Sequence, residues 1–259
     1  MSKPSSPDQT EQFLQDLPEI APGQAFRFAC HPEVPCFNAC CSDLTLMLTP
    51  YDVLMLRRQL NLGSQEFLSR HASSGTHPQT GFPLVFMTML DDERKRCPFV
   101  RPEGCSVYNA RPGACRAYPL GRASRLEDGQ VKERYFLVQE EHCQGFVQDK
   151  HWTPSAWYAD QQLLIYNEEN DRYMALMAMQ RQTGRLLDRK RSAMALMGLY
   201  QPDNFQEFIR NSRLFERLDL PEERQAFILA DEYATIDFAY HWLEFLLYGR
   251  SKVLRPRTE

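Results

Sequence analysis

Alternating apolar and polar positions predict a few short strands in the first part of the chain. Phe26-Arg-Phe28 alternates in this way and predicts a short strand. The stretch from Phe82 to Leu90 is apolar, partly β-branched and bounded by turn residues, so it predicts a second strand. Residues 134–139 predict a third strand, which follows a turn at Asp128-Gly129.

Helix-start signals lie between these strands. Thr49 followed by Pro50 combines a capping residue with proline at the first helical position, and the helix is expected to end near Asn61. Ser64 is expected to cap a second, short helix. The polar stretch over residues 69–80 is expected to be a long loop.

The second part of the chain is predicted to be helical, because long segments there carry apolar residues between helix-start and helix-stop signals. Thr153-Pro154 repeats the earlier signal, and Gly249 marks the last stop. We therefore expect an α+β fold, with a small irregular cysteine-rich domain of few short strands followed by a mainly α-helical region. The expected helices cover residues 154–182, 185–199, 203–216 and 221–248. The expected divisions are a mobile leader over 1–22, the cysteine-cluster domain over 23–150, the helical region over 151–249 and a basic tail over 250–259.

Composition narrows the class of protein. The 259 residues include 43% hydrophobic residues and carry a formal net charge of −4, so overall charge predicts no nucleic-acid or membrane partner. The first twelve residues have no apolar core of a secretory signal, and no apolar run reaches the roughly 18 residues of a membrane span. We therefore expect a cytoplasmic protein, whose thiols stay reduced.

Eight cysteines, all between Cys30 and Cys143, need another explanation in a reducing compartment. Thiolate is the soft ligand that zinc and iron-sulfur clusters prefer. Cys-x2-Cys zinc-ribbon spacing is absent, and Pro32 and Pro35 exclude regular structure from the first group, so we expect long loops that close around a centre. The predicted metal ligands are Cys30, Cys36, Cys40, Cys41, Cys97, Cys105, Cys115 and Cys143.

Eight thiols can fill two tetrathiolate sites, or one site with thiols left over. In an extended backbone the side chains of Cys40 and Cys41 would point to opposite faces, so one of them would serve a site and the other something different. His31 and His142 each adjoin a cysteine and are candidate substitute ligands or hydrogen-bond donors to the site. The alternative is that the thiols are merely buried, but several lie beside proline or glycine in predicted loops, which favours metal binding.

The second group of cysteines lies in a basic environment. Residues 94–125 contain eight basic side chains and one acidic side chain, Glu103. Cations near a thiolate lower its pKa and stabilise the metallated state, which is the structural interpretation. The functional interpretation is that Arg111 and Arg116 hold a carboxylate or phosphate of a substrate. A nucleic-acid platform is not indicated, because few aromatic residues interleave with these charges.

The cysteine pattern resembles a known family. Cys-x5-Cys-x3-Cys-Cys is followed by Cys97-Pro-Phe, then by Gly-Cys105-x-Val-Tyr-x-x-Arg-Pro-x-x-Cys115-Arg-x-Tyr-Pro, and by a later cysteine. This arrangement, over about residues 26–146, resembles the bacterial YkgJ-like cysteine-cluster family, described as putative zinc- or iron-chelating. It is also similar to the cluster region of flagellin lysine methylases, which would imply a protein-modifying enzyme.

Two function hypotheses follow. The first is a metal-binding protein that holds an iron-sulfur cluster, such as a four-iron cluster, or zinc, and acts as a sensor, carrier or partner subunit. Its helical region would bind a protein partner. The second is an iron-sulfur redox or group-transfer enzyme in which Arg111, Arg116 and Tyr118 line a cofactor- or substrate-binding pocket beside the cluster. The phosphate-loop, nucleophile-elbow and zinc-protease motifs are missing.

Overall fold

The computed structural model describes residues 17–127, 130–249 and 251–257. These residues form two compact units, each built from two separate stretches of the chain. The first unit comprises the described residues up to Asp43 together with Asp92–Glu168. The second comprises Leu44–Asp91 and the described part of Glu169–Glu259. Because strands in small sheets accompany a helical C-terminal region, the predicted α+β class is confirmed.

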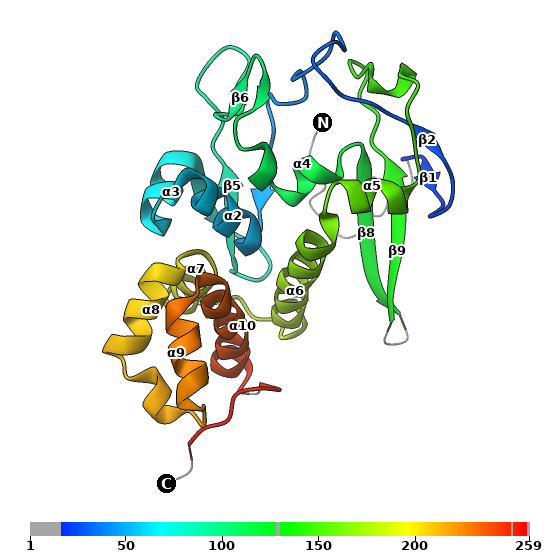
Figure 1. Cartoon of the computed structure of the whole chain (residues 1–259). Helices are drawn as coiled ribbons and strands as arrows, with labels where there is room; N and C mark the ends of the chain where they lie inside the picture. The colour runs from blue at the N-terminus through cyan, green and yellow to red at the C-terminus, as the bar shows by residue number, and fades with distance from the viewer. Residues whose placement is uncertain (1–16, 128–129, 250, 258–259) are drawn as a thin grey trace. The chain divides into compact units, whose positions relative to one another are not determined.

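The first unit contains the longest hairpin of the described chain, β8 and β9, which Figure 1 shows in green. β1 pairs with β9, β10 pairs with β2, and β6 pairs with β7, all antiparallel. Leu120 and Phe136 on the hairpin are buried. The strands are β1 Glu19–Ile20, β2 Phe26–Arg27, β6 Val100–Arg101, β7 Gly104–Cys105, β8 Leu120–Glu127, β9 Gln130–Leu137 and β10 His151–Trp152.

An aromatic cluster forms the core of the first unit. The ring of Phe28 lies edge-on to Tyr118, Phe146 and Trp157, with centroids 5.8, 5.4 and 5.5 Å away. Such edge-to-face pairs stabilise a core beyond the area they bury. The helices of this unit are η1 Tyr108–Ala110, α4 Gly113–Ala117, η2 Gly145–Val147, α5 Pro154–Asp160 and the first turns of α6 Leu163–Gln182.

In the second unit a three-stranded sheet of order β3-β5-β4 accompanies two helices. Thr49 caps the first of them: its hydroxyl accepts from Asp52 N–H at 3.1 Å, and the Asp52 carboxylate accepts from Thr49 N–H at 2.8 Å. Asn61, in the left-handed conformation, ends it, so both predicted boundaries are confirmed. These elements are β3 Met47–Leu48, α2 Pro50–Leu60, α3 Ser64–His71, β4 Ala72–Thr76 and β5 Pro83–Met87.

The remaining helices of the second unit pack around α10, which contacts α7, α8 and α9 (Figure 1). Two buried tyrosines join helices to strands: Tyr173 donates to the Pro83 carbonyl at 2.6 Å, and Tyr200 to the Leu48 carbonyl at 3.1 Å. These helices are the later turns of α6, α7 Arg189–Tyr200, α8 Pro202–Asn211, η3 Leu214–Arg217, α9 Glu222–Ala230 and α10 Glu232–Tyr248.

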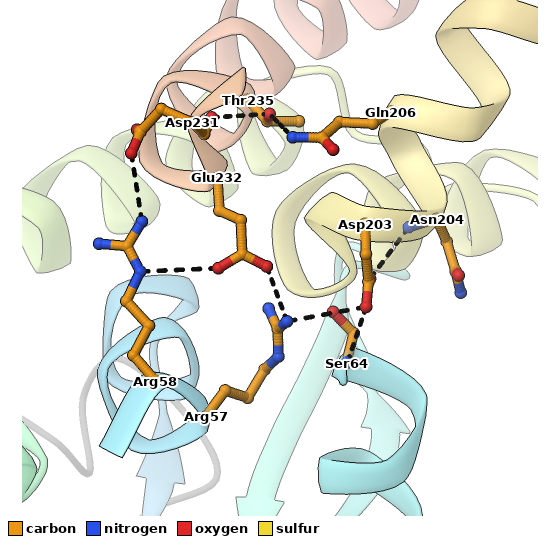
Figure 2. A network of polar contacts seen from close by, with 9 residues as sticks. All are labelled: Arg57, Arg58, Ser64, Asp203, Asn204, Gln206, Asp231, Glu232 and Thr235. Carbon is orange, nitrogen blue, oxygen red and sulfur yellow. Dashed lines mark hydrogen bonds and ion pairs between the residues drawn. The ribbon is translucent and has the colours of Figure 1, made fainter. Parts of the chain in front are cut away.

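A network of charged side chains connects α2 to α8 and α10 (Figure 2). Arg57, only 4% exposed, lies 2.8 Å from the Glu232 carboxylate and 3.7 Å from that of Asp203. The Asp203 carboxylate also accepts from Ser64 N–H at 2.9 Å. A buried arginine is tolerated only when its charge is compensated, so these carboxylates hold the helices together.

Some sequence-based boundaries are wrong. The helix cap before α3 is Gly63 rather than Ser64, whose N–H is bound by Asp203 instead. Residues 69–76 are not a loop, because α3 runs to His71 and β4 then pairs with β5, whereas residues 77–80 form a turn as expected. β4 is an edge strand of mainly exposed small residues, so its sequence has no apolar alternation. Its strand conformation therefore comes from pairing with β5.

Two predicted helices are each divided. The segment 154–182 breaks at Gln162, which adopts φ 54°, and the segment 221–248 breaks at Asp231, whose carboxylate accepts from Ala234 N–H at 2.8 Å and caps α10. The segment 203–216 ends as η3, and the segment 185–199 begins only after Asp188. Gly249, at φ 65°, ends α10 as predicted.

The predicted leader lies mostly outside the described residues, as does the turn at Asp128-Gly129. Of the leader's described part, Glu19–Ile20 forms β1. Leu254 of the predicted basic tail is buried. Among the described helices, none combines the length and the apolar character that crossing a membrane would require.

Candidate metal centre

All eight cysteines lie among the described residues of the first unit, and all are free thiols. Cys30 is exposed and the other seven are partly buried. Four of them follow one another in a series of turns, as expected for the proline-containing first group. Cys97 precedes the β6–β7 hairpin, Cys105 ends β7, Cys115 lies in α4 and Cys143 precedes η2. The fold therefore brings one continuous loop against three later segments.

One set of backbone contacts places the end of the first loop beside the hairpin. Cys97 N–H donates to the Cys41 carbonyl at 2.8 Å, and Ser42 forms a β-bridge with Arg96. Gly104 adopts φ 127° in the hairpin turn, a conformation that favours glycine. Cys41, Cys97 and Cys105 are thus held on one side of the loop.

A second set places the beginning of the loop beside Cys143. Ala29 N–H donates to the Gly145 carbonyl at 3.1 Å, and Gln144 N–H donates to the Cys36 sulfur at 3.1 Å. A Cβ at position 145 would lie 2.6 Å from the Phe28 ring, so only glycine allows this approach. The backbone thus brings Cys30 and Cys36 to the segment that follows Cys143.

The thiols near Cys30 influence its pKa electrostatically. Burial, followed by the nearby thiols of Cys40, Cys36 and Cys143, raises the pKa of Cys30 to about 11. The buried Tyr118 hydroxyl faces Cys143 without a close hydrogen-bond partner among the described residues, and burial followed by this thiol raises the Tyr118 pKa. A phenol in this position is a ready donor to a thiolate.

Cys40 lies in a turn and Cys41 in the bend that follows it, so the argument that holds for an extended backbone does not apply at this position. The Cys41 thiol acts as donor toward Cys40 and lowers the pKa of Cys40 to about 7. The same interaction, followed by burial, raises the pKa of Cys41, and the thiols of Cys40, Cys115 and Cys97 add to this effect. The two thiols therefore interact with each other, and each has further neighbours of its own: Glu140 for Cys40, and Cys115 and Cys97 for Cys41.

Cys97 and Cys105 lie in partly desolvated positions that are lined by backbone donors. Burial raises the pKa of both thiols, and N–H groups of Phe99 and Val100 oppose this effect at Cys97, as does that of Val107 at Cys105. N–H···S contacts of this kind stabilise thiolates that ligate metal.

Arg111 and Arg116 are almost fully buried beside this second group of thiols. Arg116 donates to the carbonyls of Arg111 and Gln161, both at 3.0 Å, and to that of Asn109. Arg111 donates to the Tyr108 carbonyl at 2.7 Å and to the Gln161 side chain. Arg111 also lies near the thiols of Cys105 and Cys115. Both guanidinium groups thus bind the protein's own oxygens, and substrate binding by them stays a prediction.

The two candidate histidines lie at the rim and face carboxylates. His31 is 3.8 Å from Glu33, and His142 is 3.3 Å from Glu140. Both side chains are about half exposed, and their role as ligands stays a prediction.

The chemistry of the donor set fits zinc or iron, since free thiols are accompanied by N–H donors and a buried hydroxyl. The thiols lie farther apart than metal coordination requires. Within the described ranges, no three His, Cys, Asp or Glu side chains converge on a point that could hold a metal ion. Metal binding would have to draw the loops together, as expected where folding and binding are linked.

Three residues of this region were not predicted from the sequence. Gln144 donates its backbone N–H to Cys36, and Glu140 places a carboxylate near Cys40. Gln161 accepts hydrogen bonds from two arginines. No motif marks them. Gln144 could have been suspected only from its place directly after Cys143.

Taken together, eight free thiols on irregular loops define a cysteine-rich metal-binding class of domain. Residues 29–144, which include every cysteine, match the CxxCxxCC family, described as a putative zinc- or iron-chelating domain, so the chain contains a domain of this family and the resemblance is confirmed. Comparisons with curated proteins and with solved structures gave no match.

Proposed function

We propose that this protein binds zinc or an iron-sulfur cluster through the thiolates of its cysteine-rich domain and acts as a metal-dependent sensor, carrier or partner subunit. The observation that carries this proposal is that eight free thiols occupy one unit, with backbone or side-chain donors directed at several of them. Buried thiols without a metal role would not need such donors.

Both metal types suit this environment. Zinc takes four thiolates in structural sites, and iron-sulfur clusters are held by four cysteines. The cations Arg101 and Arg111 near Cys105 would offset the negative charge of either centre. Since the guanidinium groups of Arg111 and Arg116 bind the protein's own carbonyls, their contacts support a metal-binding protein over an enzyme that uses them for substrate.

A protein partner is the second part of the proposal. Leu186 and Phe227, in the C-terminal region, are each 62% exposed. These two exposed side chains are the candidate contacts for such a partner.

Purification without oxygen, followed by absorption spectroscopy and elemental analysis, tests the metal. A brown protein with iron and labile sulfide supports a cluster, and a colourless protein with zinc supports a thiolate site. The protein purified in this way is then incubated with zinc, or with iron and sulfide. If it retains neither metal, the proposal is overturned.

A further inference from the structure

We propose that residues 181–191 form a docking site for an acidic segment of a partner protein, with Leu186 as the apolar contact. This segment, the basic loop, belongs to the second unit and joins the end of α6 to the start of α7. The inference rests on the partner binding proposed above, and it specifies which surface binds and what charge the partner carries there.

The basic loop differs in charge from the chain as a whole. It contains five basic side chains and one acidic side chain, whereas the whole chain carries a net charge of −4. All of these charged residues are exposed. Arg191 lies 3.0 Å from the carboxylate of Asp188. The other basic side chains have no carboxylate partner among the described residues, and they are Arg181, Arg185, Arg189 and Lys190.

Three of these cations lie where they oppose local stability. Arg189, Lys190 and Arg191 occupy the first turn of α7, directly after its cap, Asp188, and no acidic residue accompanies them in that turn. The positive end of the helix dipole lies at this end, so acidic residues would stabilise it and basic residues destabilise it. A local charge pattern that opposes helix stability is expected where the charges serve binding.

Hydrogen bonds hold the backbone of the basic loop in one conformation. The Gln180 side-chain amide donates to the Arg185 carbonyl at 2.7 Å, and the Thr183 hydroxyl donates to the Gln180 carbonyl at 2.7 Å. Leu187 N–H donates to the Thr80 carbonyl at 2.9 Å, which ties the loop to the turn before β5. A partner would therefore meet cations on a preformed backbone, so binding costs little ordering of the loop.

Leu186 adds an apolar contact within the charged segment. Its side chain is 62% exposed, although the next residue, Leu187, is held through its backbone. An acidic segment that also carries an apolar side chain matches both features. Its carboxylates would pair with the guanidinium groups, which present two parallel N–H donors, and its apolar side chain would cover Leu186.

The composition of the basic loop favours an acidic protein segment over other anionic macromolecules. None of the residues 181–191 is aromatic, so the loop lacks the stacking side chains of single-strand nucleic-acid sites. A membrane surface is bound through a broad apolar face beside the cations, and one exposed leucine provides little of that area.

Fluorescence anisotropy with the full-length chain tests the site. The probe is a short labelled peptide of Glu, Ser and a single Leu, and the comparison peptide has Gln in place of Glu. The wild type is expected to bind only the Glu peptide, and added salt should weaken this binding. The double variant Arg185→Gln/Lys190→Gln should bind about tenfold more weakly, and Leu186→Ser should also weaken binding.

The matched control removes one arginine and one lysine elsewhere in the second unit. Arg217 and Lys252 are both exposed, so Arg217→Gln/Lys252→Gln should leave peptide binding unchanged. Circular dichroism verifies that each variant is folded. The salt dependence of wild-type binding needs no variant and tests the charge contribution by itself.

The proposal is wrong if the wild type does not bind the Glu peptide, or if the control variant weakens binding as much as Arg185→Gln/Lys190→Gln. It is also wrong if phosphatidylserine vesicles or single-stranded DNA bind the basic loop more tightly than the peptide does. Elemental analysis of the same preparations keeps the metal question separate. Loss of peptide binding with unchanged metal content concerns the basic loop alone, whereas metal-free protein that still binds the peptide contradicts only the metal binding.

Discussion

Arg116 donates a hydrogen bond of 3.0 Å to the backbone carbonyl of Gln161, forty-five positions along the chain, where α5 ends. The Gln161 side chain accepts from Arg111 at the same place. Two buried arginines thus fasten the segment carrying Cys105 and Cys115 to the break between α5 and α6. At this break the acceptors of Gln161 are bound by arginine side chains, and not by the next turn of a continuing helix.

Replacing Arg116 with alanine should lower the free energy of unfolding of the first unit by about 3 kcal/mol, because three carbonyls would lose their donor in a buried site. Trp152 and Trp157 lie in this unit and Trp242 lies in the second, so tryptophan fluorescence during urea unfolding, in a Trp242→Phe background, measures the change. Arg94→Ala, at an exposed position of the same unit, is the control and should change stability by less than about 0.5 kcal/mol. Equal effects of the two substitutions would contradict the structural role.

Glu232→Gln should destabilise the second unit by about 2 kcal/mol, since it removes the closest countercharge of the buried Arg57 guanidinium (Figure 2). Asp203, 3.7 Å away, limits the loss. Glu66→Gln breaks the exposed pair of Glu66 with Arg70 and should cost less than about 0.5 kcal/mol. Urea unfolding followed by circular dichroism compares the two variants, and a Glu66 effect as large as that of Glu232 would refute the argument.

Cys40 should be the faster of two thiols to react with iodoacetamide in metal-free protein at neutral pH. Its pKa is lowered to about 7, whereas that of Cys30 is raised to about 11. Allowing for the weaker nucleophilicity of the more acidic thiolate, the rate ratio should be on the order of a hundredfold. Mass spectrometry of alkylated peptides measures both rates. Faster labelling of Cys30, the more exposed thiol, would show that exposure outweighs thiolate content.

Zinc binding should weaken as pH falls. The pKa values of Cys30, Cys97 and Cys105 are raised in the metal-free protein, so these thiols are protonated at neutral pH and zinc must displace their protons. Each displaced proton lowers the apparent affinity by about tenfold per pH unit below the thiol pKa. Competition with a coloured chelator at about pH 6 and about pH 8 measures this dependence. An affinity that did not change with pH would exclude thiols as the ligands.

Local signals predicted some elements accurately. Thr49, Pro50 and Asp52 determine the start of α2 through contacts within four residues, and Gly249 determines the end of α10 through its own backbone conformation. β4 was missed because its stability comes from β5, a partner that sequence pattern does not reveal. The break at Gln162 was missed for the same kind of reason, since distant arginines bind the adjacent Gln161.

The sequence alone determined the class of this protein. Eight thiols in one region favour soft-metal chemistry whatever the fold, and residues 29–144 match a family described as putative zinc- or iron-chelating. Only the tertiary structure decided which thiols face each other, that Arg111 and Arg116 bind the protein's own carbonyls, and that residues 44–91 pack with the C-terminal helices. Ligand chemistry belongs to residue type, whereas proximity depends on hydrogen bonds and packing between segments far apart in the chain.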